Sequence, residues 1–275
     1  MEAGTDLRPV DEAATDLRPV EASPITLEQY EQIRFVAAVK HGEREILFDT
    51  PNRNCAWRVQ TLFDKEPDTI AWIGTFAQNA VFVDIGANIG LYSIWAAMTA
   101  GARVFAFEPE AQNFAQLNRN IVINRCNVAA FPLALSDETR IGPLFLSSTE
   151  PGGSCHNFGA AVDYKYEPMK PAYKQGAVAM QLDDLIDGGL LPQPHHIKVD
   201  VDGIEPKVVR GAEKAIRGAQ SVLIETNSNL DDHRAMSRMV ESWGFRVDPM
   251  QIVAAQRTHG NFKGVGNVIF YRERA

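Results

Sequence analysis

The stretch that decides the fold is VFVDIGANIGLYS, residues 81–93. It begins with a strand-like run, VFVDI, passes through Gly86 and Gly90, and ends in helix-forming sequence. A glycine directly after a strand lets the backbone approach a ligand, and a second glycine permits close packing of the helix that follows. The stretch therefore predicts a strand, a ligand-binding turn and a helix.

The same alternation of strand-like and helical sequence continues toward the C-terminus. Mostly continuous apolar runs, typical of buried parallel strands, occupy residues 103–108, 128–135, 196–201 and 221–226. Helical periodicity fills several of the intervals between them. This repetition predicts the α/β class, with a doubly wound and mostly parallel sheet. The final FRVDP and GVGNVIFYRE predict that the last strand is antiparallel.

Three segments fall outside this pattern. Residues 1–24 contain TDLRPV twice and are rich in acids, which predicts a disordered tail, with a docking segment as the alternative. Residues 25–66 predict a small N-terminal cap that opens with a short helix within 25–40, and residues 67–275 form the main domain. Within that domain, residues 147–177 are long for a connector, so we expect a binding loop or lid there.

The composition, with 45% hydrophobic and 23% charged residues, is that of a globular protein. A net charge of -8 argues against nucleic acid as a partner, because nucleic-acid binding normally requires a basic surface. The three cysteines are widely spaced and odd in number, which favours a reducing compartment. We also expect no membrane span and no signal peptide, hence a cytoplasmic location. The oligomeric state is left open.

Two acids at strand ends indicate what the turn binds. Asp84 ends the first of these strands, and Glu108 ends the next, where a carboxylate accepts both hydroxyls of a ribose. A dinucleotide site would show three glycines as GxGxxG, whereas this turn reads GANIG. The turn better suits a ligand with a nucleoside end and an amino-acid end, which is S-adenosylmethionine.

Several short motifs occur in one order and spacing: DIGANIGLYS, FEPE at 107–110, LALSD at 133–137, LDDLI at 182–186 and IKVDVDGIE at 197–205. Together they resemble the FkbM family of S-adenosylmethionine-dependent methyltransferases over about residues 60–230. The resemblance implies a class I methyltransferase fold, which is Rossmann-like, and transfer of a methyl group to a hydroxyl, often on a sugar or a polyketide-like product.

The resemblance also implies which residues bind the cofactor. By position in the motifs, the methionine part would be surrounded by Asp84, Gly86, Asn88 and Gly90. Glu108 would bind the ribose. Ser136 and Asp137, at the end of the third strand, would lie near the adenine.

Methyl transfer to an alcohol requires a group that takes the hydroxyl proton. Asp200 in KVDVDGIEP is the first candidate base, and His156 in the long loop is the second. Alternatively, Asp200, Asp202 and Glu225 would hold a divalent cation that lowers the pKa of the hydroxyl. Glu205 either belongs to this group of acids or stabilises a helix N-terminus.

The leading hypothesis is an O-methyltransferase that acts on a small molecule or glycan. A nicotinamide-dependent oxidoreductase on a similar sheet is the rival enzyme, disfavoured by the missing third glycine. A methyltransferase-fold scaffold without catalysis is the alternative from a different class. It would show the loss of Asp84, a motif glycine or Glu108, and the sequence keeps all of them.

Overall fold

The computed structural model describes residues 25–273. The chain divides into two compact units at Phe35 and Val36. In the first unit the described part holds α1 (Leu27–Gln32), which begins with a reciprocal capping box between Thr26 and Gln29. The predicted helix within 25–40 is therefore short, and strand β1 begins at Val36. The predicted tail, residues 1–24, lies outside the described residues.

The second unit is built around a central sheet. Within residues 25–273 this sheet has seven strands, in the order β12, β13, β11, β10, β3, β4, β5. Their bounds, in that order, are Phe245–Val247, Val265–Arg272, Ser221–Asn227, His196–Val199, Val81–Ile85, Arg103–Phe107 and Val128–Phe131. β13 pairs antiparallel with both of its neighbours, and the other pairs are parallel. The predicted α/β class with an antiparallel last strand is confirmed.

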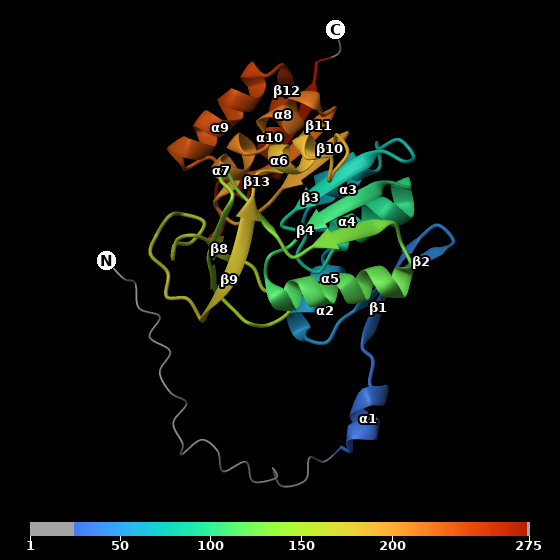
Figure 1. Cartoon of the computed structure of the whole chain (residues 1–275). Helices are drawn as coiled ribbons and strands as arrows, with labels where there is room; N and C mark the ends of the chain where they lie inside the picture. Colours follow the sequence, from blue (N-terminus) through green and yellow to red (C-terminus); the bar gives the residue numbers. More distant parts are fainter. Residues whose placement is uncertain (1–24, 274–275) are drawn as a thin grey trace. The chain divides into compact units, whose positions relative to one another are not determined.

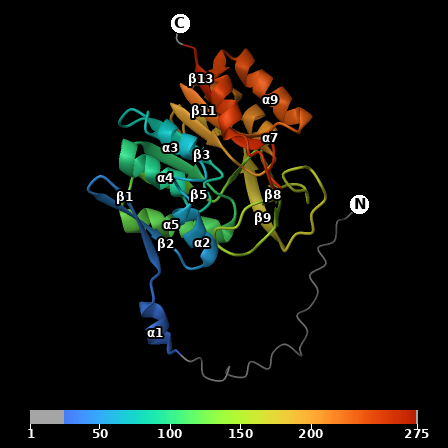
Figure 2. The same cartoon turned by 180° about the vertical axis from the view of Figure 1, so that it is seen from behind.

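Helices cover both faces of this sheet, as Figures 1 and 2 show from opposite sides. One core cluster joins the sheet to α2 (Arg53–Gln60), α3 (Pro67–Ile73) and α4 (Leu91–Trp95), the last continuing as a π-helical turn, Ala96–Ala100. α5 (Ala111–Asn124) packs on the same face through Leu117 and Ile121. A second cluster holds α6 (Leu182–Asp187), α7 (Glu205–Arg210), α8 (Glu213–Gly218) and α9 (Asp231–Ser242). α10 (Pro249–Ala255) connects β12 to β13.

A β-hairpin precedes α2. Its strands, β1 (Val36–His41) and β2 (Arg44–Asp49), pair antiparallel. Ile46 and Phe48 are fully buried in the cluster that contains α2 and α3. Asn120 and Asn124 of α5 accept the backbone N–H groups of Asp49 and Leu47 at 2.8 and 2.9 Å. The hairpin is thereby fixed against the helix that follows β4.

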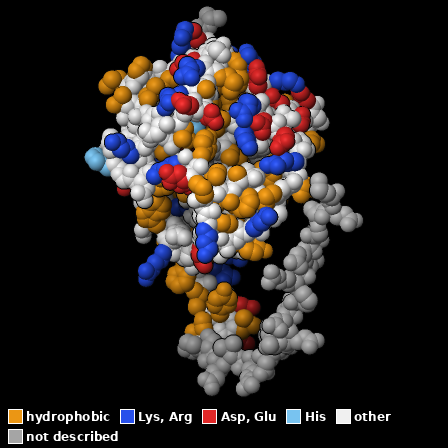
Figure 3. All heavy atoms as spheres, turned by 90° about the vertical axis from the view of Figure 1, so that its left-hand side faces the viewer, with side chains coloured by type: hydrophobic (Ala, Val, Ile, Leu, Met, Phe, Trp, Pro, Cys, Tyr) orange, Lys and Arg blue, Asp and Glu red, His pale blue; other side chains and the backbone are white. Residues whose placement is uncertain are grey.

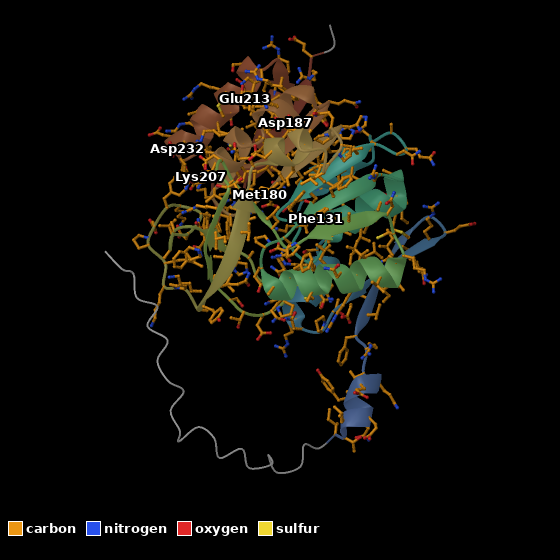
Figure 4. All side chains as sticks on the ribbon, viewed as in Figure 1. Phe131, Met180, Asp187, Lys207, Glu213 and Asp232 are labelled. Carbon is orange, nitrogen blue, oxygen red and sulfur yellow. The ribbon has the colours of Figure 1, made fainter. Side chains whose placement is uncertain are left out.

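The run 128–135 was predicted as one strand, and this prediction is wrong. β5 ends at Phe131, because the next residue is a proline and has no N–H for the ladder. The chain then enters a second sheet, where β6 (Ala134–Leu135) pairs with the end of β9 (Tyr173–Met180). Figure 4 labels Phe131 and Met180 at these two strand ends.

The second sheet has the order β6, β9, β7, β8. Its strands are Ala134–Leu135, Tyr173–Met180, Arg140–Leu146 and Asn157–Phe158, in that order. The segment 147–177, predicted as a loop, therefore contains β8 and ends inside β9. Leu144, Leu146 and Phe158 form the small core of this sheet with Ala134 and Ala179.

The surface carries charges of both signs. On the face shown in Figure 3, acidic and basic side chains are interspersed with hydrophobic ones. Within residues 25–273, every helix is too short or too polar to cross a membrane.

Candidate functional site

The turn after β3 brings two strand ends unusually close. Gly86 has φ +80°, and a Cβ atom there would lie 1.8 Å from the carbonyl oxygen of Asp200 at the end of β10. Gly90 has φ +87°, and a Cβ atom there would lie 2.4 Å from Cδ1 of Leu117 in α5. Gly86 is required because the atom it would meet is backbone, whereas at Gly90 the positive φ is what favours glycine.

Two cavities adjoin at this turn, and Gly86, Asn88 and Asp200 line both of them. The first, of about 540 Å³, extends over the ends of β4 and β5 toward the second sheet. Its walls include Phe107, Glu108, Leu133, Leu135, His156, Phe158 and Asp202. The second, of about 460 Å³, extends toward α2 and α4. Its walls include Arg58, Lys65, Glu66, Tyr92 and Lys198.

Glu108 is the buried acid of the first cavity. Its oxygens Oε2 and Oε1 accept the backbone N–H groups of Asn88 and Glu110 at 2.8 and 2.9 Å. Burial raises the pKa of Glu108 to about 7, although these two N–H groups act in the opposite direction. The carboxylate is thus fixed in position and retains lone pairs that can accept hydroxyl groups of a ligand.

A glycine-containing segment, residues 150–156, lies across the turn. The Gly153 carbonyl accepts hydrogen bonds from Nδ2 of Asn88 at 2.6 Å and Nδ2 of Asn113 at 3.2 Å. The N–H of Cys155 donates to Oδ2 of Asp202 at 2.7 Å. Asn88, Cys155 and Asp202 all have positive φ, between 52° and 61°, which is uncommon for residues other than glycine. Backbone strain of this kind concentrates at functional sites.

Asp84 lies behind the turn and lines neither cavity. Side chains alternate along β3, so Asp84 points into the helix layer that contains α4, where Ser93 Oγ donates to it at 2.6 Å. Its Oδ1 lies 3.9 Å from Nζ of Lys198, the residue directly opposite in β10. Nζ of Lys198 also donates to Oδ2 of Asp200 at 2.7 Å. Among the described residues, Lys198 links Asp84 to the wall of the second cavity.

The lysine controls the charge of Asp200. Burial alone would raise the pKa of Asp200, but the charge and hydrogen bond of Lys198 lower it below its usual value. Burial raises the pKa of Asp84, which Lys198 only partly offsets. The carboxylates in turn raise the pKa of Lys198 above its ordinary value, against the effect of burial. Asp200 is therefore ionised at neutral pH, and Lys198 is protonated.

His156 lines the first cavity and directly precedes β8 in the chain. Its Nδ1 accepts the N–H of Ser147 at 3.2 Å, which assigns the proton of the neutral ring to Nε2. Nε2 is buried and has no partner among the described residues. Burial lowers the pKa of His156 to about 4. At neutral pH the ring is consequently neutral, with its proton on Nε2.

The acids predicted as a metal site are held apart by separate partners. Asp200 pairs with Lys198, Asp202 accepts from Cys155, and Glu225 lies 3.9 Å from Arg257. Within residues 25–273, no three His, Cys, Asp or Glu side chains are grouped to hold a metal ion. These residues do not fit the predicted divalent cation.

Glu205 organises the turn between β10 and α7. Its carboxylate accepts the N–H of Val201 at 2.9 Å and the N–H of Gly203 at 3.0 Å. The side chain is fully buried, which raises its pKa to about 7. Glu205 therefore fixes the turn that carries Asp200 and Asp202, and it lines neither of the two cavities that adjoin at Gly86.

Ser136 and Asp137 lie away from the first cavity, whose wall is formed by Leu133, Ala134 and Leu135 just before them. Asp137 instead forms an ion pair with Arg210 of α7 at 2.9 Å. That ion pair lowers the pKa of Asp137, against the effect of burial.

The far side of the Asp200 turn carries a small cavity of about 170 Å³, lined by Tyr164, Glu225, Asn227 and His233. Tyr164 comes from the long segment after β8. Its ring stacks on Phe262 at a centroid distance of 4.4 Å. Burial and neighbouring acids raise the pKa of Glu225 well above its usual value. The segment that carries Tyr164 and the segment that carries Phe262 are distant in sequence and thus meet close to Glu225.

Sequence reasoning missed the charged wall of the second cavity. Tyr92 Oη donates to Oε2 of Glu66 at 2.7 Å, and Nζ of Lys65 lies 2.9 Å from Oε1 of the same carboxylate. Arg58 on α2 completes the wall. Arg58 lies outside the motifs, because it comes from the N-terminal cap and reaches the turn only through tertiary contacts.

Comparison with known families identifies the type of protein. The model of a family described as the methyltransferase FkbM domain matches residues 84–247. The chain belongs to this family. The resemblance inferred from the motifs is confirmed, as is the assignment to the methyltransferases, and the oxidoreductase and scaffold alternatives are set aside.

Curated relatives agree with this assignment. Hexuronic acid methyltransferase AglP of Haloferax volcanii is 26% identical over 178 residues, which cover 64% of this chain and 67% of that protein. Methyltransferase sdnD of Sordaria araneosa is 27% identical over 200 residues, covering 64% and 77%. Methyltransferase 1 of Beauveria bassiana is 26% identical over 188 residues, covering 64% and 76%.

Proposed function

We propose that this methyltransferase uses S-adenosylmethionine and transfers its methyl group to a hydroxyl oxygen of a sugar, glycan or related natural product. One observation carries the proposal: two unlike cavities meet at Gly86, Asn88 and Asp200. The first combines apolar side chains such as Phe107 and Leu133 with the carboxyl groups of Glu108, Asp200 and Asp202, whereas the second has charged walls of both signs. A nucleoside suits the first, and a zwitterionic amino acid suits the second.

The residues of the first cavity fit a nucleoside. Glu108 has free lone pairs for the two ribose hydroxyls, and Phe107 and Leu133 provide an apolar surface for the base. Nε2 of His156 is a buried donor without a partner, which fits an acceptor nitrogen of the base. Gly86 has no side chain, so a ligand can approach the backbone where the two cavities meet. In this proposal His156 is a ligand-binding residue and not the base.

In the second cavity, Arg58 and Lys65 are cationic, whereas Glu66 and Asp200 are anionic. This pairing suits a carboxylate and an ammonium group on one ligand, as in the methionine end of the cofactor. A dinucleotide would place a second nucleotide here, and its phosphates would face Glu66 and Asp200. The charge pattern therefore favours S-adenosylmethionine.

Bound S-adenosylmethionine would supply a methyl group that is carried on a positively charged sulfur. Attack by an oxygen on that methyl group would release the rest of the cofactor as a neutral thioether. The enzyme mainly aligns the reacting atoms. In our proposal Asp200, fixed by Lys198, accepts the hydroxyl hydrogen of the acceptor and orients the attacking lone pair. The hydroxyl proton becomes strongly acidic as the new bond forms, so a carboxylate of lowered pKa can take it.

The acceptor class rests on one of the relatives. AglP is named a hexuronic acid methyltransferase. This name supports a sugar-type acceptor for the present chain.

Calorimetric titration with S-adenosylmethionine and S-adenosylhomocysteine tests the cofactor. We expect Glu108→Ala to weaken both by roughly 10- to 100-fold, because a hydrogen bond to a charged group contributes about 1.5–3 kcal/mol. Glu138→Ala is the matched control, since Glu138 is exposed and pairs only with Arg140 among the described residues. Absence of heat with either compound for the wild-type protein would refute the proposed cofactor. Radiolabelled methyl transfer to hexoses and hexuronic acids then identifies the acceptor.

Cofactor affinity should depend on pH through Glu108. Burial raises its pKa from 4.5 to about 7, so the unliganded fold loses stability as pH rises from 4.5 through 7. The ionised carboxylate accepts the ribose hydroxyls better than the acid does. We therefore expect affinity for S-adenosylhomocysteine to rise between pH 6 and 8, and Glu108→Gln to abolish this dependence. An equal slope in both proteins would contradict the assignment.

A further inference from the structure

Arg58 stands where the second cavity meets the segment 150–156. Its Nε donates to the carbonyl of Gly152 at 2.7 Å, and its Nη2 lies 3.5 Å from the carbonyl of Gly153. Within residues 25–273, no carboxylate forms an ion pair with the guanidinium within 4.0 Å, although its charge acts on the nearby Asp202. By contrast, Lys65 is paired with Glu66 at 2.9 Å. Arg58 is thus the cation of this wall that is available to an anion.

The guanidinium of Arg58 has N–H donors that the Gly152 and Gly153 carbonyls do not use. Arginine carries five N–H donors in a planar fork, and the two carbonyls occupy only part of it. Arg58 lines the cavity that holds both cationic and anionic groups. A carboxylate is the anion that this fork binds in two parallel hydrogen bonds.

The same segment is tied to the first cavity. Gly152 donates its N–H to Oδ1 of Asn113 at 2.8 Å, and the Gly153 carbonyl accepts from Nδ2 of Asn113 at 3.2 Å. Asn113 lines the first cavity. One short segment therefore joins an arginine of the second cavity to an amide of the first.

We propose that Arg58 binds the carboxylate at the amino-acid end of the cofactor and couples its binding to closure of residues 150–156 over the nucleoside end. This inference rests on the proposed use of S-adenosylmethionine. A ligand that carries the carboxylate fixes Arg58, and Arg58 in turn fixes the Gly152 carbonyl. A ligand without the carboxylate makes only the contacts of the first cavity.

Calorimetry with two ligands tests this assignment. S-adenosylhomocysteine carries the amino-acid end, whereas methylthioadenosine lacks it. We expect Arg58→Met to weaken S-adenosylhomocysteine by roughly 10- to 100-fold, the loss of a charge-assisted pair, and to leave methylthioadenosine within about threefold. Arg58→Lys keeps the charge and should recover part of the affinity. Asn113→Ala, which frees the segment from the first cavity, should weaken both ligands by a similar factor.

The outcomes separate the two proposals. If the wild-type protein binds S-adenosylhomocysteine and Arg58→Met weakens both ligands equally, Arg58 acts only through the segment and the inference is overturned. Unchanged binding in Arg58→Met overturns it as well. If the wild-type protein binds neither ligand, the proposed cofactor itself fails. Thermal melts of each variant show whether a loss reflects unfolding.

Discussion

Replacement of Lys198 by methionine should lower the free energy of unfolding by roughly 3–5 kcal/mol, the usual cost of removing one partner from a buried ion pair. The lysine side chain is 2% exposed and lies 2.7 Å from Asp200 and 3.9 Å from Asp84. Methionine has a similar length and no charge. Two carboxylates would then remain close together without their cation, and the folded protein would have to accommodate or protonate them.

The loss should depend on pH with a defined sign. In the wild-type protein Lys198 lowers the pKa of Asp200, so the stability from this pair is present above the usual pKa of 3.8 and lost as pH falls. Without Lys198 the pKa values of Asp84 and Asp200 rise, and stability is lost as pH rises through them. Urea unfolding at pH 5 and pH 8 should therefore show a larger deficit at pH 8.

Two further variants serve as a control and as a partial rescue for the Lys198→Met measurement. Lys214→Met removes an exposed partner of Asp187 and should leave the unfolding midpoint unchanged. Lys198→Met combined with Asp84→Asn removes one of the two stranded charges and should recover part of the stability. A Lys198→Met protein as stable as the wild type at pH 8 would show that the buried pair does not hold the strand ends together.

Gly86→Ala should destabilise the fold by roughly 2–4 kcal/mol, from overpacking together with a strained backbone. The added Cβ would lie 1.8 Å from the carbonyl oxygen of Asp200 and 3.2 Å from Cγ1 of Val201, at φ +80°. The near atom is backbone, so the ends of β3 and β10 must move apart. Cofactor affinity and methyl transfer should each fall about 100-fold, the scale of loss that follows a misplacement of 1 Å at a reacting centre.

Gly176→Ala is the matched control for this change. Gly176 lies in β9, and a Cβ atom there would meet nothing within 4 Å. Urea unfolding and calorimetry should find the control equal to the wild type. Wild-type affinity in Gly86→Ala would mean that the turn relaxes without moving Asp200, and it would contradict the junction of cavities on which the proposed function rests.

The sequence predicted the parts of the fold that local pattern determines. Continuous apolar runs marked β3, β4, β10 and β11 correctly, because both faces of these strands are buried. The structure places Gly86 and Glu108 at strand ends beside the first cavity, and their role toward the cofactor stays a prediction. The break after Phe131 was missed, although Pro132 gave a local signal for it.

The parts that depend on tertiary contacts were not predictable. Arg58 meets Gly152 across 94 residues of chain. Asp84 was assigned to the cofactor from its position at a strand end, whereas the alternation of β3 turns its side chain toward Ser93 and Lys198. Lys198 itself sits within an apolar run, where a single sequence does not reveal which carboxylate it will meet.

The second sheet has a consequence for how this enzyme can diversify. Its four strands, β6 to β9, all come from residues 134–180, one continuous piece of chain. In the central sheet β5 neighbours β4, and β10 lies between β3 and β11, so none of these pairings involves that piece. It carries His156, Phe158 and the segment 150–156, so it forms one wall of the site. Sequence changes within this piece can alter that wall without changing any strand pairing of the central sheet.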